Sequence, residues 1–143
     1  MGTISRNFSF SEFEKSDTAK AYRIQNVITE WNVRDNIIAL VENLLQPLRD
    51  AWGQPLFINS GYRCKELNEK VGGVETSQHR TGQAADVGCS DPLGLARVLL
   101  KTRLEFDQAI VYPTFLHLSY RDDGKNRRQL LYNKSYKGKK LSV

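Results

Sequence analysis

The sequence predicts a single α+β domain, residues 1–143, in which helices pack on a small, mostly antiparallel sheet. A long amphipathic helix pattern lies in the first half of the chain, and short strand patterns separated by turn residues dominate the second half. No linker rich in Pro, Gly or Ser divides the two halves. With 143 residues, 40% of them hydrophobic, the chain is long enough to bury a core without disulfides or a structural metal.

The N-terminal segment, residues 1–30, is expected to pack on the domain as short helical turns, mainly within 8–24. Ser11 and Ser16 are candidate helix caps, because serine hydroxyls accept hydrogen bonds from the free N–H groups of a first turn. Three aromatic side chains are expected to anchor the segment to the core: Phe8, Phe10 and Phe13.

The strongest helix pattern runs from Asp35 to Trp52. Six apolar residues recur at spacings of three and four and form one stripe: Ile37, Ile38, Val41, Leu44, Leu45 and Leu48. Pro47 lacks an N–H group, so a kink or an early end is expected there. Gly53 is a good stop signal.

Later segments are short. Strands are predicted at 56–59 (buried), 84–88, 108–112, 115–120 and 129–132, with the third and fourth forming a hairpin. A helical turn is predicted at 65–71, and Asp91 with Pro92 should open a helix that reaches about Leu104. Residues 133–143 form a basic tail that is free to be mobile.

Composition and charge argue against a nucleic-acid-binding protein and against a protein that spans a membrane. The formal net charge of +5 favours polyanionic surroundings, but the basic residues are scattered and no nucleic-acid-binding motif is present. We therefore expect no nucleic-acid partner. No apolar run reaches the ~20 residues of a membrane helix, and the first residues lack a secretory signal. A chain made in the cytoplasm, and released by some other agent, is expected.

Cys64 and Cys89 form no C-x-x-C pair, so a thiolate metal site is not predicted. The sequence is compatible with two separate half-buried thiols at these positions and with one disulfide that joins two loops. The two histidines of the chain, His79 and His117, lie where a metal site could use them, together with Asp86. Two imidazoles, one carboxylate and one open position are typical of catalytic zinc.

Several motifs together resemble a known family. Ser77-x-His79-x-x-Gly82-x-Ala84-x-Asp86 follows Ser60-Gly61-Tyr62-Arg63, Asn68 and Val71-Gly72-Gly73, and precedes Phe106-Asp107-Gln108 and His117-Leu118-Ser119. This order resembles the zinc D-alanyl-D-alanine carboxypeptidases and L-alanyl-D-glutamate peptidases, which share the hedgehog-like fold and include many phage endolysins and prophage proteins. The resemblance extends from Phe8 to about Tyr120.

The resemblance implies one Zn²⁺ per chain, held by His79, Asp86 and His117. It implies that Arg63 faces the substrate as a catalytic cation, where a guanidinium can pair with a carboxylate or a developing oxyanion. An ordinary structural salt bridge is the alternative for Arg63. Five further residues are expected to contact substrate or to orient the ligands: Ser60, Tyr62, Ser77, Gln108 and Tyr112.

The chain departs from the family at Tyr112, where a catalytic glutamate is usual. Tyrosine, with an ordinary pKa near ~10, is a poor base at neutral pH. Asp107 is the best remaining carboxylate for the catalytic base, and a structural hydrogen-bond acceptor is its alternative. If the hairpin loop is 112–115, or only 113–114, His117 pairs with Ile110 and Asp107 points away from the metal. If the loop is 112–114, Asp107 points toward the metal.

The leading hypothesis is a monomeric zinc metallopeptidase that hydrolyses stem or cross-link peptides of peptidoglycan, of phage or prophage origin, and that reaches the wall through a holin. The bond that it cuts, a terminal D-alanine or the L-alanine–D-glutamate link, stays open. The alternative is a zinc-bound module that binds wall peptides with weak or no catalysis, prompted by Tyr112. A nucleic-acid-binding domain ranks last, because it leaves the two histidines unexplained.

Overall fold

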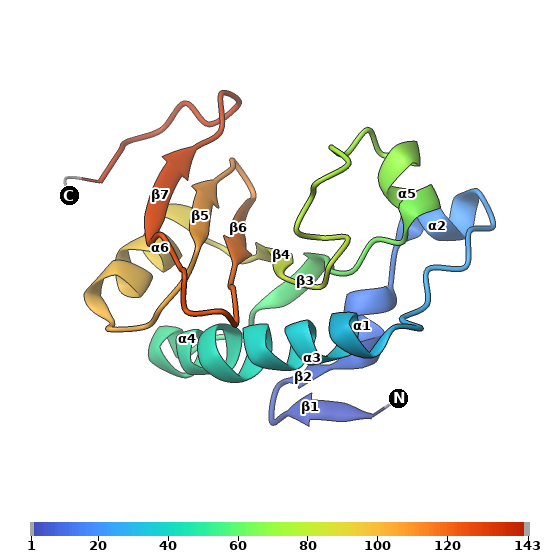
Figure 1. The fold of residues 1–143 in the computed structure, drawn as a ribbon. Helices are drawn as coiled ribbons and strands as arrows, with labels where there is room; N and C mark the ends of the chain where they lie inside the picture. The colour runs from blue at the N-terminus through green and yellow to red at the C-terminus, as the bar shows by residue number, and fades with distance from the viewer. Residues whose placement is uncertain (1, 142–143) are drawn as a thin grey trace.

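The computed structural model describes residues 2–141 (Figure 1). Its helices are α1 (Phe10–Glu14), α2 (Asp17–Ala21), α3 (Trp31–Leu40), the π-helical turn η1 (Val41–Leu45), α4 (Gln46–Trp52), α5 (Lys65–Lys70) and α6 (Pro92–Lys101). Its strands are β1 (Thr3–Ser5), β2 (Phe8–Ser9), β3 (Phe57–Ser60), β4 (Ala84–Gly88), β5 (Gln108–Val111), β6 (Phe115–Ser119) and β7 (Gln129–Tyr132).

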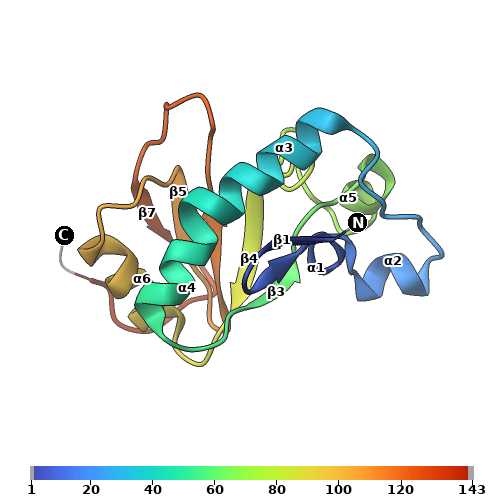
Figure 2. The same ribbon diagram turned by 90° about the horizontal axis from the view of Figure 1, so that it is seen from below.

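Five strands form the main sheet in the order β3-β4-β6-β5-β7. All neighbours are antiparallel except β5 and β7, which are parallel. The continuous helix α3-η1-α4 crosses below this sheet in Figure 1 and in front of it in Figure 2, so it covers one face. The predicted α+β class, with helices on a small and mostly antiparallel sheet, is confirmed.

The long helix begins earlier than predicted, at Trp31, and continues to Trp52 without a break. Pro47 neither ends it nor shortens it. One turn before the proline, the backbone changes to i→i+5 hydrogen bonding, and Gln46 N–H donates to the Val41 carbonyl. The helix accommodates the missing N–H group of Pro47 through this π-helical turn. Gly53 ends the helix in the left-handed region, at φ 76°, as predicted.

In the N-terminal segment, the side chains of Phe8, Phe10 and Phe13 are buried in the core. Ser16 caps α2 by accepting a hydrogen bond from Ala19 N–H at 3.1 Å. The cap of α1 is Ser9 instead of Ser11, because the Glu12 carboxylate returns to accept from Ser9 N–H at 2.9 Å. The small β1–β2 hairpin was not predicted.

Several other boundaries differ from the prediction, and α5, β5 and β6 each end one residue earlier than predicted. Strand β3 is shifted by one residue and lies at the sheet edge with Phe57 63% exposed, so it is not a buried strand. Helix α6 ends at Lys101, because the extended backbone of Thr102 stops it and the Thr102 hydroxyl donates to the Leu99 carbonyl.

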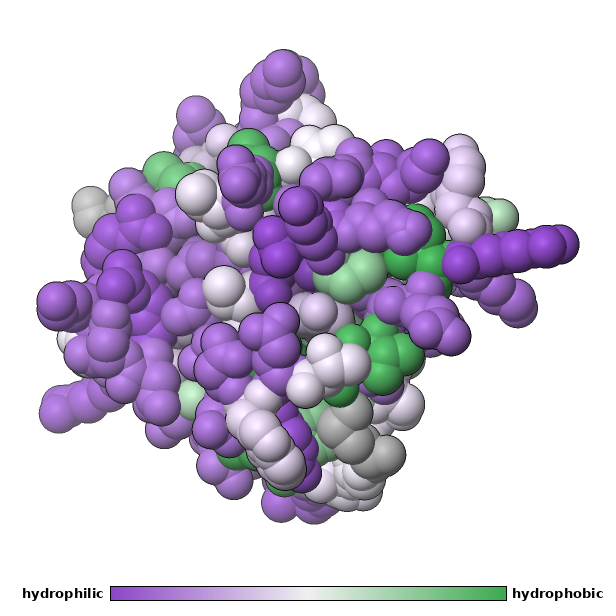
Figure 3. Space-filling view, turned by 45° about the vertical axis from the view of Figure 1, so that its right-hand side comes forward, coloured by the Kyte–Doolittle hydropathy of each residue, from purple (hydrophilic) through white to green (hydrophobic). Residues whose placement is uncertain are grey.

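The surface, the cysteines and the C-terminal segment add four facts. The face in Figure 3 is mostly hydrophilic, with apolar residues in separate small groups. Within 2–141, no helix combines the length and the apolar character that a membrane crossing requires. Cys64 and Cys89 are both free thiols. In the predicted tail, Tyr136 stacks on Tyr132 of β7, and Leu141 N–H donates to the Tyr132 hydroxyl. The mobility of the tail stays a prediction.

Candidate metal centre

Two of the predicted ligands project from the sheet face that the long helix does not cover. In β4, Ala85 and Val87 point into the core, and therefore Asp86 between them points to the other side. His117 alternates in the same way with two core leucines of β6. Asp86 and His117 are direct partners in the β4–β6 register, so their side chains lie next to each other.

The third ligand, His79, comes from the loop that connects α5 to β4 and folds back over the sheet. Gly82 makes the return possible, because it adopts φ 78° and a Cβ there would meet the Val33 carbonyl oxygen at 2.7 Å. The loop is fixed to the segment after β3 by two contacts. Arg63 N–H donates to the His79 carbonyl at 3.0 Å, and His79 Nδ1 lies 2.7 Å from the Gly61 carbonyl oxygen.

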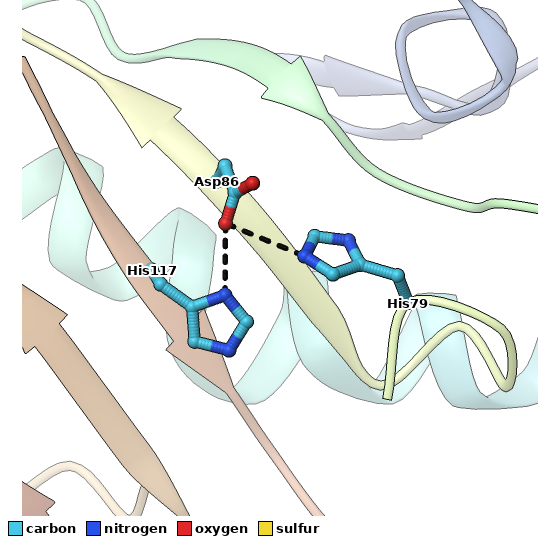
Figure 4. A group of neighbouring side chains, drawn as sticks. All are labelled: His79, Asp86 and His117. Carbon is cyan, nitrogen blue, oxygen red and sulfur yellow. Dashed lines mark hydrogen bonds and ion pairs between the residues drawn. The ribbon is translucent and has the colours of Figure 1, made fainter. Parts of the chain in front are cut away.

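These contacts assign the tautomer of His79. A carbonyl oxygen only accepts, so Nδ1 carries the proton and Nε2 presents its lone pair. His79 Nε2 lies 3.3 Å from Asp86 Oδ1, and His117 Nδ1 lies 2.8 Å from the same oxygen (Figure 4). The three side chains offer ligand atoms within 4.8 Å of one another.

This arrangement fits a divalent metal. Ligand atoms about 2 Å from a tetrahedral zinc are separated by about 3.3 Å, close to the distances seen here. Two nitrogens and one carboxylate oxygen leave one position open. Burial raises the pKa of the Asp86 carboxyl, but the hydrogen bond with His117 and the close approach of His79 outweigh burial and hold the pKa well below its ordinary value. Asp86 is therefore ionised, the state that a metal ligand needs.

Comparison with known proteins agrees with this geometry. A family model described as Peptidase M15 matches residues 6–119, most of the chain. The chain belongs to the peptidase M15 family. Over 91 residues it is also 30% identical to the zinc D-Ala-D-Ala carboxypeptidase of Streptomyces albus G, a match that covers 57% of this chain and 31% of that protein. The chain thus spans about a third of the length of this relative.

In this M15 domain the three ligands lie in a cleft of about 720 Å³. Arg63 and Tyr112 also line it. The Arg63 Nε is buried and has no hydrogen-bond partner among residues 2–141, and burial lowers the pKa of its guanidinium. A structural salt bridge, the alternative reading of Arg63, is therefore absent from the described residues.

Tyr112 reaches the cleft because four residues, 112–115, separate Val111 from its partner Leu116. This register pairs His117 with Ile110, the first of the two hairpin alternatives. Tyr112 stacks on Phe115 with ring centroids 4.2 Å apart. Burial, and then the Asp86 charge, raise the pKa of the Tyr112 hydroxyl, so it keeps its proton at neutral pH.

Asp107 is buried, with none of its surface exposed, and it accepts several hydrogen bonds. Arg127 donates to it from Nε at 2.8 Å, from Nη2 at 2.9 Å and from the backbone N–H at 3.2 Å. The side-chain amide of Gln78 donates to it at 3.1 Å. The hydrogen bond with Arg127, opposed by burial, lowers the pKa of Asp107 to about 2. These are the contacts of a structural acceptor, the second of the two roles considered for Asp107.

The other predicted site residues have different surroundings. Ser77 lines the cleft and its hydroxyl accepts from His79 N–H at 3.2 Å, so it supports the ligand loop. Gln108 lines the cleft, but its amide donates to Gln129. Ser60 pairs with Asp86 through the backbone ladder, and Tyr62 is buried in the core. Neither Ser60 nor Tyr62 lines the cleft, so direct substrate contact by these two is not supported.

The cleft residues that sequence reasoning missed include Gln78, Arg121 and Arg127. Gln78 had one usable signal, its position directly before a ligand. The two arginines lie beyond β6, after the last motif of the resemblance, and nothing in their local sequence distinguishes them from other surface arginines.

Proposed function

We propose that this chain is a zinc-dependent peptidase that hydrolyses peptides of peptidoglycan. The observation that carries the proposal is the convergence of His79, Asp86 and His117 at the base of an open, polar cleft. Membership of the M15 family supports the peptidase class. The name of the Streptomyces albus G relative, a zinc D-Ala-D-Ala carboxypeptidase, supports zinc and a substrate of the cell-wall type.

The roles of the side chains follow from their positions. When bound, zinc supplies a Lewis acid that polarises the scissile carbonyl and lowers the pKa of a water that it coordinates. His79 and His117 would hold the metal through ring nitrogens, and Asp86 would supply negative charge that partly neutralises it. Arg63, a cation without a partner in 2–141, is positioned to stabilise negative charge that develops on the carbonyl oxygen.

Among residues 2–141, the side chains of the cleft that are candidates for the general base are poor proton acceptors. Among residues 2–141, the carboxylates that line the cleft are those of Asp86 and Asp107. Asp86 is assigned to the metal, and Asp107, with a pKa of about 2 and four hydrogen bonds, is a poor proton acceptor near neutral pH. Tyr112 is protonated there, so its hydroxyl can donate a hydrogen bond to the substrate but not remove a proton.

This deficit supports a second candidate function, a zinc-bound module that holds a wall peptide and cuts it slowly or not at all. Tyr112→Glu separates the two, because it restores a carboxylate at the position where the resemblance expects one. A large gain in turnover would favour the binding module, and brisk turnover by the native chain would rule it out.

The decisive experiment measures the release of amino acids or peptides from purified wall fragments by the zinc-loaded chain. Cleavage that a chelator abolishes and added zinc restores is expected. If no wall peptide is cut under any metal condition, the peptidase proposal is wrong. Mass analysis of the products would distinguish removal of a terminal D-alanine from cleavage after L-alanine. A monomeric state, a phage or prophage origin and release through a holin stay predictions.

A further inference from the structure

We propose that Arg127 is a substrate-binding residue that holds a carboxylate of the peptide, at a subsite of the cleft separate from Arg63. The proposal rests on the proposed peptidase function and names a specificity determinant for it. It implies that the substrate is a peptide with a free carboxylate that the enzyme distinguishes from the corresponding uncharged amide.

The first support is the fixed position of Arg127. Its guanidinium lies against the buried Asp107 carboxylate through two parallel hydrogen bonds, from Nε and from Nη2. Asp107 is itself held by Gln78, the residue directly before the metal ligand His79. A long side chain at the surface usually loses much freedom when it binds a ligand. Arg127 is already ordered, so less of that cost remains.

The second support is the open edge of the same guanidinium. An arginine side chain has five N–H donors, and the pair with Asp107 uses the side formed by Nε and Nη2. The edge formed by Nη1 and the outer N–H of Nη2 has no acceptor among residues 2–141. The side chain is 54% exposed, and the residue lines the cleft. This free fork matches the geometry of a second carboxylate.

The third support is the charge of the cleft. Three arginines line it (Arg63, Arg121 and Arg127), whereas both lining carboxylates already have partners. Asp86 lies between the two histidines, and Asp107 is buried behind Arg127. No acidic side chain within 2–141 is therefore left in the cleft to repel an anionic peptide, and a bound divalent metal adds further positive charge.

The test compares a soluble wall stem peptide with analogues in which each carboxylate in turn is replaced by an amide. KM and kcat are measured with the zinc-loaded protein, and calorimetry measures binding if turnover is absent. For the native chain, one analogue should bind about tenfold more weakly, the usual effect of losing a charge-assisted hydrogen bond. In Arg127→Lys this preference should largely disappear, through KM more than through kcat.

Lysine is chosen because it keeps a cation beside Asp107 and loses only the fork, whereas Arg127→Ala would leave a buried charge unpaired and could unfold the chain. Thermal unfolding checks that the fold is retained. Arg97→Gln, an exposed arginine of α6 outside the cleft, is the matched control and should discriminate the peptides as the native chain does.

The outcomes separate the two proposals. If the native chain neither cuts nor binds any wall peptide, the proposed function fails and this inference with it. If peptides are cut, but all carboxylates are equivalent or Arg127→Lys retains the native preference, only the role of Arg127 is disproved.

Discussion

Asp86 and His117 face each other directly across the β4–β6 pair, with Asp86 Oδ1 2.8 Å from His117 Nδ1. The sheet itself places these two proposed ligands, because opposite residues of antiparallel strands hold their side chains on the same face. Only the third ligand depends on a loop. The site is therefore a rigid pair from the sheet, completed by His79 from a segment that Gly61 and Arg63 hold in place.

His117→Ala should abolish zinc binding, with affinity falling by at least about 100-fold, because replacement of even an outer contact of a metal ligand costs 10- to 100-fold. The chain has two histidines, so no other imidazole can replace the one lost beside His79. Competition with a chromophoric chelator measures the affinity. Glu42→Gln, at an exposed position of the long helix, is the control and should bind one zinc with native affinity. Stoichiometric zinc in His117→Ala would contradict the assignment.

Arg63→Met should lower turnover of wall peptides by about 100- to 1000-fold, the usual cost of losing one group that stabilises an oxyanion. Zinc affinity should not fall, because the hydrogen bond from Arg63 to the His79 loop comes from the backbone N–H, which the variant keeps. The free energy of unfolding should stay level or rise, since the variant removes a buried donor that has no partner in 2–141. Urea unfolding and steady-state kinetics test both effects. A loss of activity that simply follows a loss of zinc would refute this role.

Local sequence patterns predicted most of the helices and strands, because the spacing of apolar residues in these segments is typical of a helix or of a strand. The apolar stripe between Ile37 and Leu48 predicted the long helix, and short strand patterns at 84–88 and 115–120 predicted two strands of the sheet. The departure at 41–45 depends on how the chain accommodates Pro47, where a kink, an early end and a π-helical turn are all compatible with one sequence.

The cluster of His79, Asp86 and His117 was predictable because histidine is rare in this chain and the motifs around it resemble a family. The role of Asp107 was not predictable. Its partners Gln78 and Arg127 are 29 and 20 residues away, and these contacts exist only after the cleft has formed. Hairpin parity described the strands correctly, but its prediction that this register turns Asp107 away was wrong, because Asp107 precedes β5 and lines the cleft.

Asp107→Asn should destabilise the chain at neutral pH by about 1–2 kcal/mol, a figure reduced for the solvent screening of half-exposed Arg127. The pKa of Asp107 is lowered to about 2 in the folded chain, so its stabilising contribution is present above the ordinary value of 3.8 and is lost as pH falls toward 2. Urea unfolding of the native chain and the variant should therefore converge over this window.

Asp123→Asn is the control for that comparison, because Asp123 pairs with Arg121 at the surface, where solvent screens the pair. Its unfolding curves should follow those of the native chain at every pH. A difference between the native chain and Asp107→Asn that stays constant from pH 7 to pH 2 would show that ionisation of Asp107 does not contribute.

Gly61→Ala should weaken both the fold and the metal site, although glycine 61 bears no ligand atom. A Cβ at this position would lie 2.8 Å from Phe13 Cα and 2.7 Å from Phe13 Cδ1, so the backbone must move. The Gly61 carbonyl accepts from His79 Nδ1, and any shift of it turns the imidazole that presents Nε2 to the metal.

We expect a loss of about 1–3 kcal/mol in the free energy of unfolding, the usual range for overpacking, and a fall of about tenfold in zinc affinity. Gly2→Ala is the matched control, because a Cβ there meets no atom within 4 Å. Chelator competition at a temperature where both variants are folded separates the two effects. If Gly61→Ala unfolds earlier but binds zinc as tightly as the native chain, the Gly61 carbonyl supports the loop without orienting His79.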